Sequence, residues 1–208
     1  MRRLGVLLVA AVLLPACGDD GSEGATVNEA SEQAPTTVVA VTADDIPVAH
    51  TPDGGWTGAM PAPVLAGCTE ALVDGAPDLA GLWEIVEVEA EAEGIVATDH
   101  PAIGAVQRIE QCGDRLVVTA SGIIHDMRVD GTEENGVQDV AEFDKVTPIT
   151  VVATYEDGVH VLRPVGLPLE ITRRRDGEQL VWDYIRFTAR LDRIGEPTDP
   201  YPTTEDTT

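Results

Sequence analysis

Closely spaced turn signals in the second half of the chain constrain its fold more than any other feature. The signals are Gly113-Asp114, Asp130-Gly131, Asn135-Gly136, Asp157-Gly158 and Asp176-Gly177. Asn-Gly and Asp-Gly pairs are preferred two-residue turns of β-hairpins, because both residue types tolerate a positive φ angle. A chain interrupted this often has little room for long helices. The pattern predicts a series of antiparallel hairpins after residue 80.

The segments between these turns alternate between apolar and polar residues, as strands with one buried face do. In residues 82–92 the even-numbered positions from Val86 onward are apolar and the odd ones are glutamates. Leu169 and Ile171 likewise alternate with polar neighbours. The predicted strands are residues 82–92, 105–111, 115–124, 126–130, 137–143, 149–155, 159–165, 169–175 and 179–191.

Eight or nine consecutive hairpin-linked strands have exposed edges unless the sheet closes on itself. A meandering barrel is the simplest closed arrangement. We therefore predict an all-β protein whose domain is an antiparallel up-and-down β-barrel of 8–9 strands. The inward positions are mostly small and only 4% of all residues are aromatic, which leaves room for an interior cavity.

The chain begins with the pattern of an export signal. Met1-Arg2-Arg3 is basic, residues 4–14 are apolar, and Leu14-Pro15-Ala16-Cys17 follows. The apolar run is too short to span a bilayer permanently. The final four residues resemble the lipobox of bacterial lipoproteins, which implies a diacylglyceryl group on Cys17 and a place on the extracytoplasmic face of the cell membrane. The alternative is an ordinary cleaved secretory signal.

Composition divides the rest of the chain. After a signal peptide of residues 1–16, residues 17–60 are expected to form a lipid-anchored, flexible acidic linker. Residues 61–195 form the predicted barrel domain, with a short helical or irregular segment at residues 63–73 before the first strand. Residues 196–208 are expected to be a disordered tail.

The net charge of the chain is −24, from 13 basic and 37 acidic residues. Removal of the signal peptide would make it more negative, because Arg2 and Arg3 would be lost with no acid. Such a charge keeps a protein soluble and opposes binding to nucleic acid or to anionic lipid headgroups. We therefore predict no nucleic-acid partner. The sequence does not indicate an oligomeric state.

Gly81-Leu82-Trp83 opens the first predicted strand, and the order of strands after it resembles the calycins, the superfamily of lipocalins and fatty-acid-binding proteins. The resemblance covers residues 81–194. It implies that Trp83 plugs one barrel end and packs on an arginine of the last strand, Arg190 or Arg193. Such a contact would be a cation–π interaction.

Two departures place the chain nearer to the lipocalins than to the fatty-acid-binding proteins. Residues 93–104 are too short for the helix pair that fatty-acid-binding proteins insert between their first two strands. Residues 184–188 lack the Arg-x-Tyr motif with which those proteins fix a carboxylate. The resemblance therefore does not imply a fatty-acid ligand. The superfamily also includes protease-inhibitor barrels with filled interiors, so a barrel of this kind need not bind a ligand inside.

With Cys17 lipidated, Cys68 and Cys112 remain as a pair in an oxidising compartment. Such a pair most often forms a disulfide, which would link the segment before the barrel to a hairpin turn. Two free buried thiols are the alternative.

Arg163 and Arg173 share the parity of apolar neighbours in their strands. If both point inward, each is a buried cation that needs a partner, and a ligand carboxylate or phosphate would supply one. Alternatively, both lie at strand ends and reach water.

No catalytic, metal or cofactor motif is recognisable, and we predict a protein that is not an enzyme and carries no cofactor. His100, His125 and His160 match no metal-ligand spacing and are interpreted as surface residues. Ser121 does not lie in Gly-x-Ser-x-Gly.

Two functions follow from these observations. In the first, the barrel binds a small apolar or amphipathic ligand in its interior. In the second, a filled barrel acts as an envelope interaction or inhibitor protein through the acidic loops of residues 93–104 and 130–136.

Overall fold

The computed structural model describes residues 40–90, 95–97 and 99–201. Apart from a 3-10 turn, η1, all regular structure there is extended, which confirms the predicted all-β class. No helix in this part of the chain is both long and apolar enough to cross a membrane. The elements are η1 (Ala43–Asp45), β1 (Gly81–Ala90), β2 (Ile95–Ala97), β3 (Val106–Cys112), β4 (Arg115–Ala120), β5 (Ile123–Arg128), β6 (Val137–Val140), β7 (Pro148–Glu156), β8 (Val159–Pro164), β9 (Ile171–Asp176), β10 (Gln179–Tyr184) and β11 (Phe187–Gly195).

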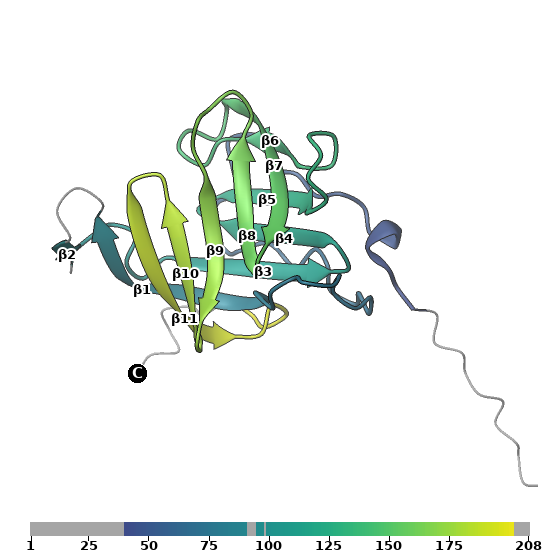
Figure 1. Cartoon of the computed structure of the whole chain (residues 1–208), viewed down its shortest axis with the longest axis horizontal. Coiled ribbons are helices and arrows are strands. Elements are labelled where there is room, and N and C mark those ends of the chain that lie inside the picture. The colour runs from purple at the N-terminus through teal and green to yellow at the C-terminus, as the bar shows by residue number, and fades with distance from the viewer. Residues whose placement is uncertain (1–39, 91–94, 98, 202–208) are drawn as a thin grey trace, which may run out of the picture. The chain divides into compact units, whose positions relative to one another are not determined.

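The strands form one antiparallel up-and-down barrel that is nearly closed. Their order is β5-β4-β3-β1-β11-β10-β9-β8-β7-β6, with β2 paired to β1 beside this path. The first and last strands, β1 and β11, pair along most of their length. The ladder is interrupted between β5 and β6, and we call this break the seam. There the Arg128 N–H donates to the Asn135 carbonyl at 2.8 Å. Figure 1 shows β8 and β9 crossing β3 and β4 at a steep angle.

The path contains ten strands, one more than the nine predicted, and the boundary between β4 and β5 is shifted, because two turns lacked a recognised signal. Ser121 and Gly122 both have positive φ angles, 48° and 90°, and end β4 within the predicted strand of residues 115–124. Residues 185–186 divide the predicted strand of residues 179–191 into β10 and β11. The loop predicted at residues 93–104 contains the short strand β2.

A bulge in β1 corrects the predicted alternation of that strand. The register with β11 shifts between Ile85 and Glu87, which changes the side of the sheet that later residues face. Trp83, Ile85 and Val88 are buried in the core, whereas Val86 is exposed. The expectation that Val86 and Val88 share a face is therefore wrong.

Residues 40–60, which we call the N-terminal strap, pack on the outside of the barrel and are not part of a free linker. Arg115 points outward from β4 and donates to the carbonyls of Ala43, Ile46 and Pro47 at 2.9, 2.6 and 2.8 Å. Asp126 of β5 accepts two hydrogen bonds from Arg115, at 2.6 and 2.8 Å. The prediction of a flexible linker is therefore wrong for residues 40–60, and residues 17–39 lie outside the described residues.

The strap also crosses the seam. The Thr51 N–H donates to Asp139 of β6 at 2.9 Å, and the Thr51 hydroxyl accepts from the Ile124 N–H of β5 at 2.9 Å. The Ala49 N–H donates to Asp126 at 2.8 Å. One segment is thus hydrogen-bonded to both strands that border the break, which holds them together where the ladder is interrupted.

The segment between the strap and β1 is irregular, so the short helix considered for residues 63–73 is absent. It covers β3, where Glu110 accepts from the Val64 and Leu65 N–H groups at 3.1 and 2.7 Å. Cys68 and Cys112 form the predicted disulfide, with their Cα atoms 6.1 Å apart. The bond fixes this segment to the end of β3.

The ends of the chain are described only in part. Residues 1–39, with the predicted signal peptide and Cys17, lie outside the described residues, as do residues 202–208. In the predicted tail, the Glu196 N–H donates to Asp199 at 2.8 Å, so a turn follows β11.

Candidate functional site

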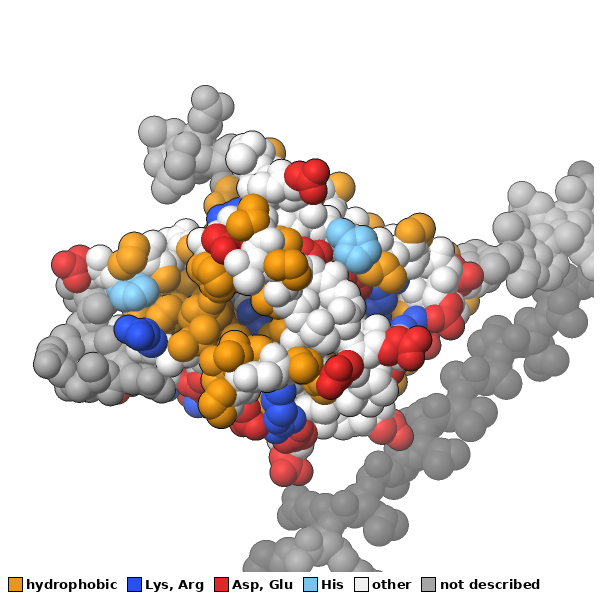
Figure 2. All heavy atoms as spheres, turned by 90° about the horizontal axis from the view of Figure 1, so that it is seen from above, with side chains coloured by type: hydrophobic (Ala, Val, Ile, Leu, Met, Phe, Trp, Pro, Cys, Tyr) orange, Lys and Arg blue, Asp and Glu red, His pale blue; other side chains and the backbone are white. Residues whose placement is uncertain are grey.

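The barrel interior is packed at one end and hollow at the other. Trp83, Leu180 and Leu191 belong to the buried cluster that fills the packed part. The hollow part is a cavity of about 140 Å³ with a predominantly apolar wall. Val118 and Ala120 of β4 and Ile123 of β5 form part of that wall. Figure 2 shows a hollow bordered by hydrophobic side chains.

The mouth of the cavity carries large apolar side chains that face solvent. Phe143 in the β6–β7 loop, Leu167 in the β8–β9 loop and Ile185 in the β10–β11 turn line the cavity and are 76, 58 and 46% exposed. Large apolar side chains that are exposed together around a hollow often mark a binding site, whereas singly scattered ones do not. The three residues come from three connections that meet at the same end of the barrel.

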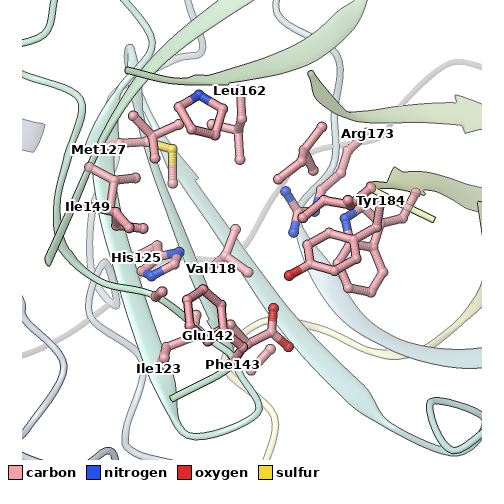
Figure 3. A pocket seen from close by; sticks show the side chains of 18 of the residues that line it. Val118, Ile123, His125, Met127, Glu142, Phe143, Ile149, Leu162, Arg173 and Tyr184 are labelled. Atoms are coloured by element: carbon pink, nitrogen blue, oxygen red, sulfur yellow. The ribbon is translucent and has the colours of Figure 1, made fainter. Parts of the chain in front are cut away.

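Arg173 is the charged residue deepest in this cavity. It lies on β9, is 5% exposed and is directed into the cavity in Figure 3. Its Nη2 donates to the Gln107 Oε1 at a long 3.4 Å, and its guanidinium lies 5.3 Å from the centroid of the Trp182 ring. Nε and Nη1 have no hydrogen-bond partner among the described residues. Burial lowers the pKa of Arg173 to about 10, so the group remains a cation at neutral pH.

Two histidines predicted to lie on the surface belong to the interior instead. His160, opposite Arg173 in the β8–β9 pair, is fully buried, and neither ring nitrogen has a partner within the described part of the chain. Burial and the nearby charge of Arg173 lower the pKa of His160 to about 3, so its ring is neutral. His125 lines the cavity, and its Nε2 lies 2.9 Å from the Val140 carbonyl.

Glu142 and Tyr184 complete the polar lining of the cavity. In Figure 3 the Glu142 carboxylate and the Tyr184 hydroxyl point into the space that the Arg173 guanidinium also faces. Burial raises the pKa of Tyr184, so its hydroxyl remains protonated. Glu142 is partly exposed and does not occur among the ion pairs of the described residues. Arg173 therefore has no direct counter-charge.

Arg163, the other candidate ligand residue, points out of the barrel. Its side chain is 38% exposed and pairs with Glu156 and Glu170, the latter at 2.7 Å. The parity of β8 is the opposite of that expected, because His160 and Leu162 face inward. Of the two predicted arginines, only Arg173 belongs to the cavity.

Trp83 is fully buried in the core, as expected for a residue that plugs one barrel end. Its Nε1 donates to the Leu79 carbonyl at 2.8 Å. The arginine over its ring is Arg175 of β9, at 4.8 Å from the centroid, and not a residue of the last strand. Arg190 pairs instead with Asp176 at 2.8 Å, which corrects the structural role predicted for it.

Arg193 explains the glycine of Gly81-Leu82-Trp83. A Cβ atom at Gly81 would lie 2.8 Å from the Arg193 Nε and 3.0 Å from the Trp83 Nε1. The position therefore has no space for a side chain.

In the described part of the chain, no group of three or more His, Cys, Asp or Glu side chains is arranged to hold a metal ion.

A scan against protein-family models and a search of curated proteins returned no match. Among solved structures, human cRBP IV is similar to this chain, with 15% sequence identity and a TM-score of 0.43. The match covers 56% of this chain and 98% of that one. Likeness at this level assigns no function.

Proposed function

We propose that this protein is a binding protein that holds a small apolar or amphipathic molecule in the cavity at the open end of its barrel. The observation that carries the proposal is the apolar cavity itself, which is walled largely by strands of the barrel and opens between Phe143, Leu167 and Ile185. A preformed site of this kind binds with little loss of side-chain and loop entropy. The apolar rim would shield the part of the ligand that remains outside.

We further propose that the protein works on the extracytoplasmic face of the cell membrane, anchored through lipid on Cys17. The support is the sequence Leu14-Pro15-Ala16-Cys17 after a short apolar run. The disulfide between Cys68 and Cys112 is consistent with an oxidising compartment. A diacylglyceryl group with two chains gives stable anchoring, whereas one chain is marginal.

Filling the cavity tests the binding proposal. Benzyl alcohol added to the wild-type protein should shift the NMR methyl signals of residues such as Met127, which lines the cavity. Ala120→Leu, which places three further carbon atoms in the cavity wall, should weaken binding at least about fivefold, because the ligand and the new side chain compete for space. The dissociation constant is obtained from the titration.

Ala66→Leu is the matched control, because Ala66 is exposed and does not line the cavity. It should leave the dissociation constant unchanged. Equal binding to both variants, or no shift of the wild-type signals, would contradict a cavity site.

The anchor has its own test. The full precursor, expressed in a bacterium with the lipoprotein pathway, should fractionate with the membrane and carry a diacylglyceryl mass on Cys17. Cys17→Ser should remove the modification and leave an uncut precursor, since the lipidated cysteine is the site of processing. A wild-type protein found unmodified in the medium would contradict the anchor and support an ordinary secretory signal.

A further inference from the structure

The buried guanidinium of Arg173 lacks hydrogen-bond acceptors, and this lack indicates the kind of ligand that the cavity would bind. Nε and Nη1 have no partner in the described structure, and the single bond from Nη2 to Gln107 is long, at 3.4 Å. Trp182 offers its ring face, which attracts the cation but accepts no ordinary hydrogen bond. Glu142 acts on Arg173 only at a distance, and a buried cation without a hydrogen-bonded counter-charge is unfavourable, so the site is complementary to an anion.

The surrounding groups limit the charge of that anion. His160 is neutral, and Glu142 adds a negative charge on the same cavity. Arg173 therefore supplies the one positive charge that can pair with an anion, and Glu142 disfavours a ligand with more than one negative charge. A phosphate dianion would leave negative charge uncompensated in an apolar cavity. A carboxylate also matches the planar array of guanidinium N–H groups.

The volume of the cavity limits the apolar part of the ligand. An apolar protein cavity of about 150 Å³ accommodates a benzene ring, and the cavity here measures about 140 Å³. A long alkyl chain would leave most of its carbon atoms outside, in contact only with the rim. The buried group is therefore a single ring or a short branched chain.

We propose that the ligand is a compact monocarboxylate, whose carboxylate pairs with Arg173 and whose ring or branched chain fills the apolar part of the cavity. The inference rests on the proposed binding function and adds the class of ligand to it. Tyr184, whose hydroxyl faces the same space in Figure 3, is placed to donate a hydrogen bond to the second carboxylate oxygen.

Calorimetric titration of the full mature chain with four probes tests this inference. Benzoate should bind about tenfold or more tightly than its neutral analogue benzyl alcohol, since only benzoate pairs with Arg173. Inorganic phosphate should bind more weakly than benzoate because of its charge. Decanoate should bind no more tightly than benzoate, because its additional carbon atoms do not fit in the cavity.

Three variants locate the contact. Arg173→Gln should weaken the binding of benzoate about tenfold or more and change the dissociation constant of benzyl alcohol by no more than about twofold. Arg163→Gln is the matched control, since Arg163 faces away from the cavity, and should change neither constant. Glu142→Gln should strengthen the binding of benzoate about two- to fivefold, because it removes a like charge from the cavity. This variant tests the inference even if the Arg173 variant does not fold.

The possible results distinguish the inference of a monocarboxylate ligand from the proposed binding function. Binding of benzyl alcohol without any preference for benzoate would overturn the monocarboxylate and leave the cavity site intact. Benzoate binding that is insensitive to Arg173→Gln, or weakened by Glu142→Gln, would also overturn it. Tighter binding of decanoate would overturn the limit on size. Failure of both aromatic probes to bind would contradict the binding function itself.

Discussion

Replacing Asp126 with asparagine is expected to lower the free energy of unfolding by about 3–5 kcal/mol. The Asp126 and Arg115 side chains are 2 and 3% exposed and are joined by two hydrogen bonds. The substitution leaves the Arg115 guanidinium buried without its counter-charge. Asparagine also has only one acceptor oxygen for the three N–H groups that Asp126 binds, two from Arg115 and one from Ala49 of the strap, so not all of these hydrogen bonds can persist. Urea denaturation of the disulfide-bonded protein measures the change.

Asp139→Asn is the matched control for this first prediction. Asp139 also accepts a strap hydrogen bond, from the Thr51 N–H, and lies 3.6 Å from the Nδ1 atom of the exposed His50, but it has no arginine partner. Asp139→Asn should lower the free energy of unfolding by about 1–2 kcal/mol, the scale of one buried hydrogen bond. The double variant Arg115→Met, Asp126→Leu should recover only part of the lost stability, because it removes both buried charges but leaves three strap carbonyls without their donor. Equal effects of Asp126→Asn and Asp139→Asn would show that the ion pair contributes nothing beyond the strap contact.

Trp83→Ala is expected to lower the free energy of unfolding by about 3–5 kcal/mol. The indole is fully buried among core side chains, and its removal creates a cavity that the strands cannot close. The variant also loses the hydrogen bond to the Leu79 carbonyl and the stacking of Arg175. The midpoint of thermal unfolding should therefore fall by many degrees, as circular dichroism would record.

Trp56→Ala provides the comparison for Trp83. Trp56 lies in the strap, is only partly buried and donates through Nε1 to the Ile123 carbonyl at 3.2 Å. Its loss should cost clearly less. If Trp83→Ala destabilises the protein no more than Trp56→Ala does, Trp83 does not close the packed end of the barrel.

The turn signals predicted most of the fold because each is a local property of a few residues. Asp157-Gly158 lies between the paired strands β7 and β8, and Asp157 has a positive φ angle. At Asp176-Gly177 the turn begins one residue later, because Asp176 is the last residue of β9. Ser121-Gly122 was missed since serine rarely adopts the conformation that it has here. The disulfide was predictable because only one cysteine pair remained once Cys17 was assigned to the anchor.

The site was only half predictable, because strand parity is ambiguous where both faces carry apolar residues. In β8, Val161 and Leu162 are adjacent and both buried, so the pattern did not show that His160 faces inward and Arg163 outward. β9 has a clearer alternation, and of the two alternatives that the sequence left open for Arg173, the inward one agrees with its burial. A buried histidine in place of an apolar residue is the feature that inverted the interpretation of β8.

The strap and the cavity depend on contacts between residues far apart in sequence. The polar composition of residues 40–60 is typical of a linker, yet Arg115 and Asp126 hold its backbone from 69 and 77 positions away. Whether an interior is hollow depends on the summed side-chain volumes of facing strands. No local pattern carries that sum, which is why sequence analysis could predict small inward residues but not which end stays empty.

The pairing of β1 with β11 sets the order in which the molecule can form. Roughly a hundred residues separate these strands, so ribosomal synthesis delivers β1 well before its neighbour. During that interval β1 has an unpaired edge that other chains can join. A folding intermediate that lacks only β11 would expose two such edges, on β1 and β10. Chaperone demand and truncation sensitivity should therefore concentrate at the C-terminal strand.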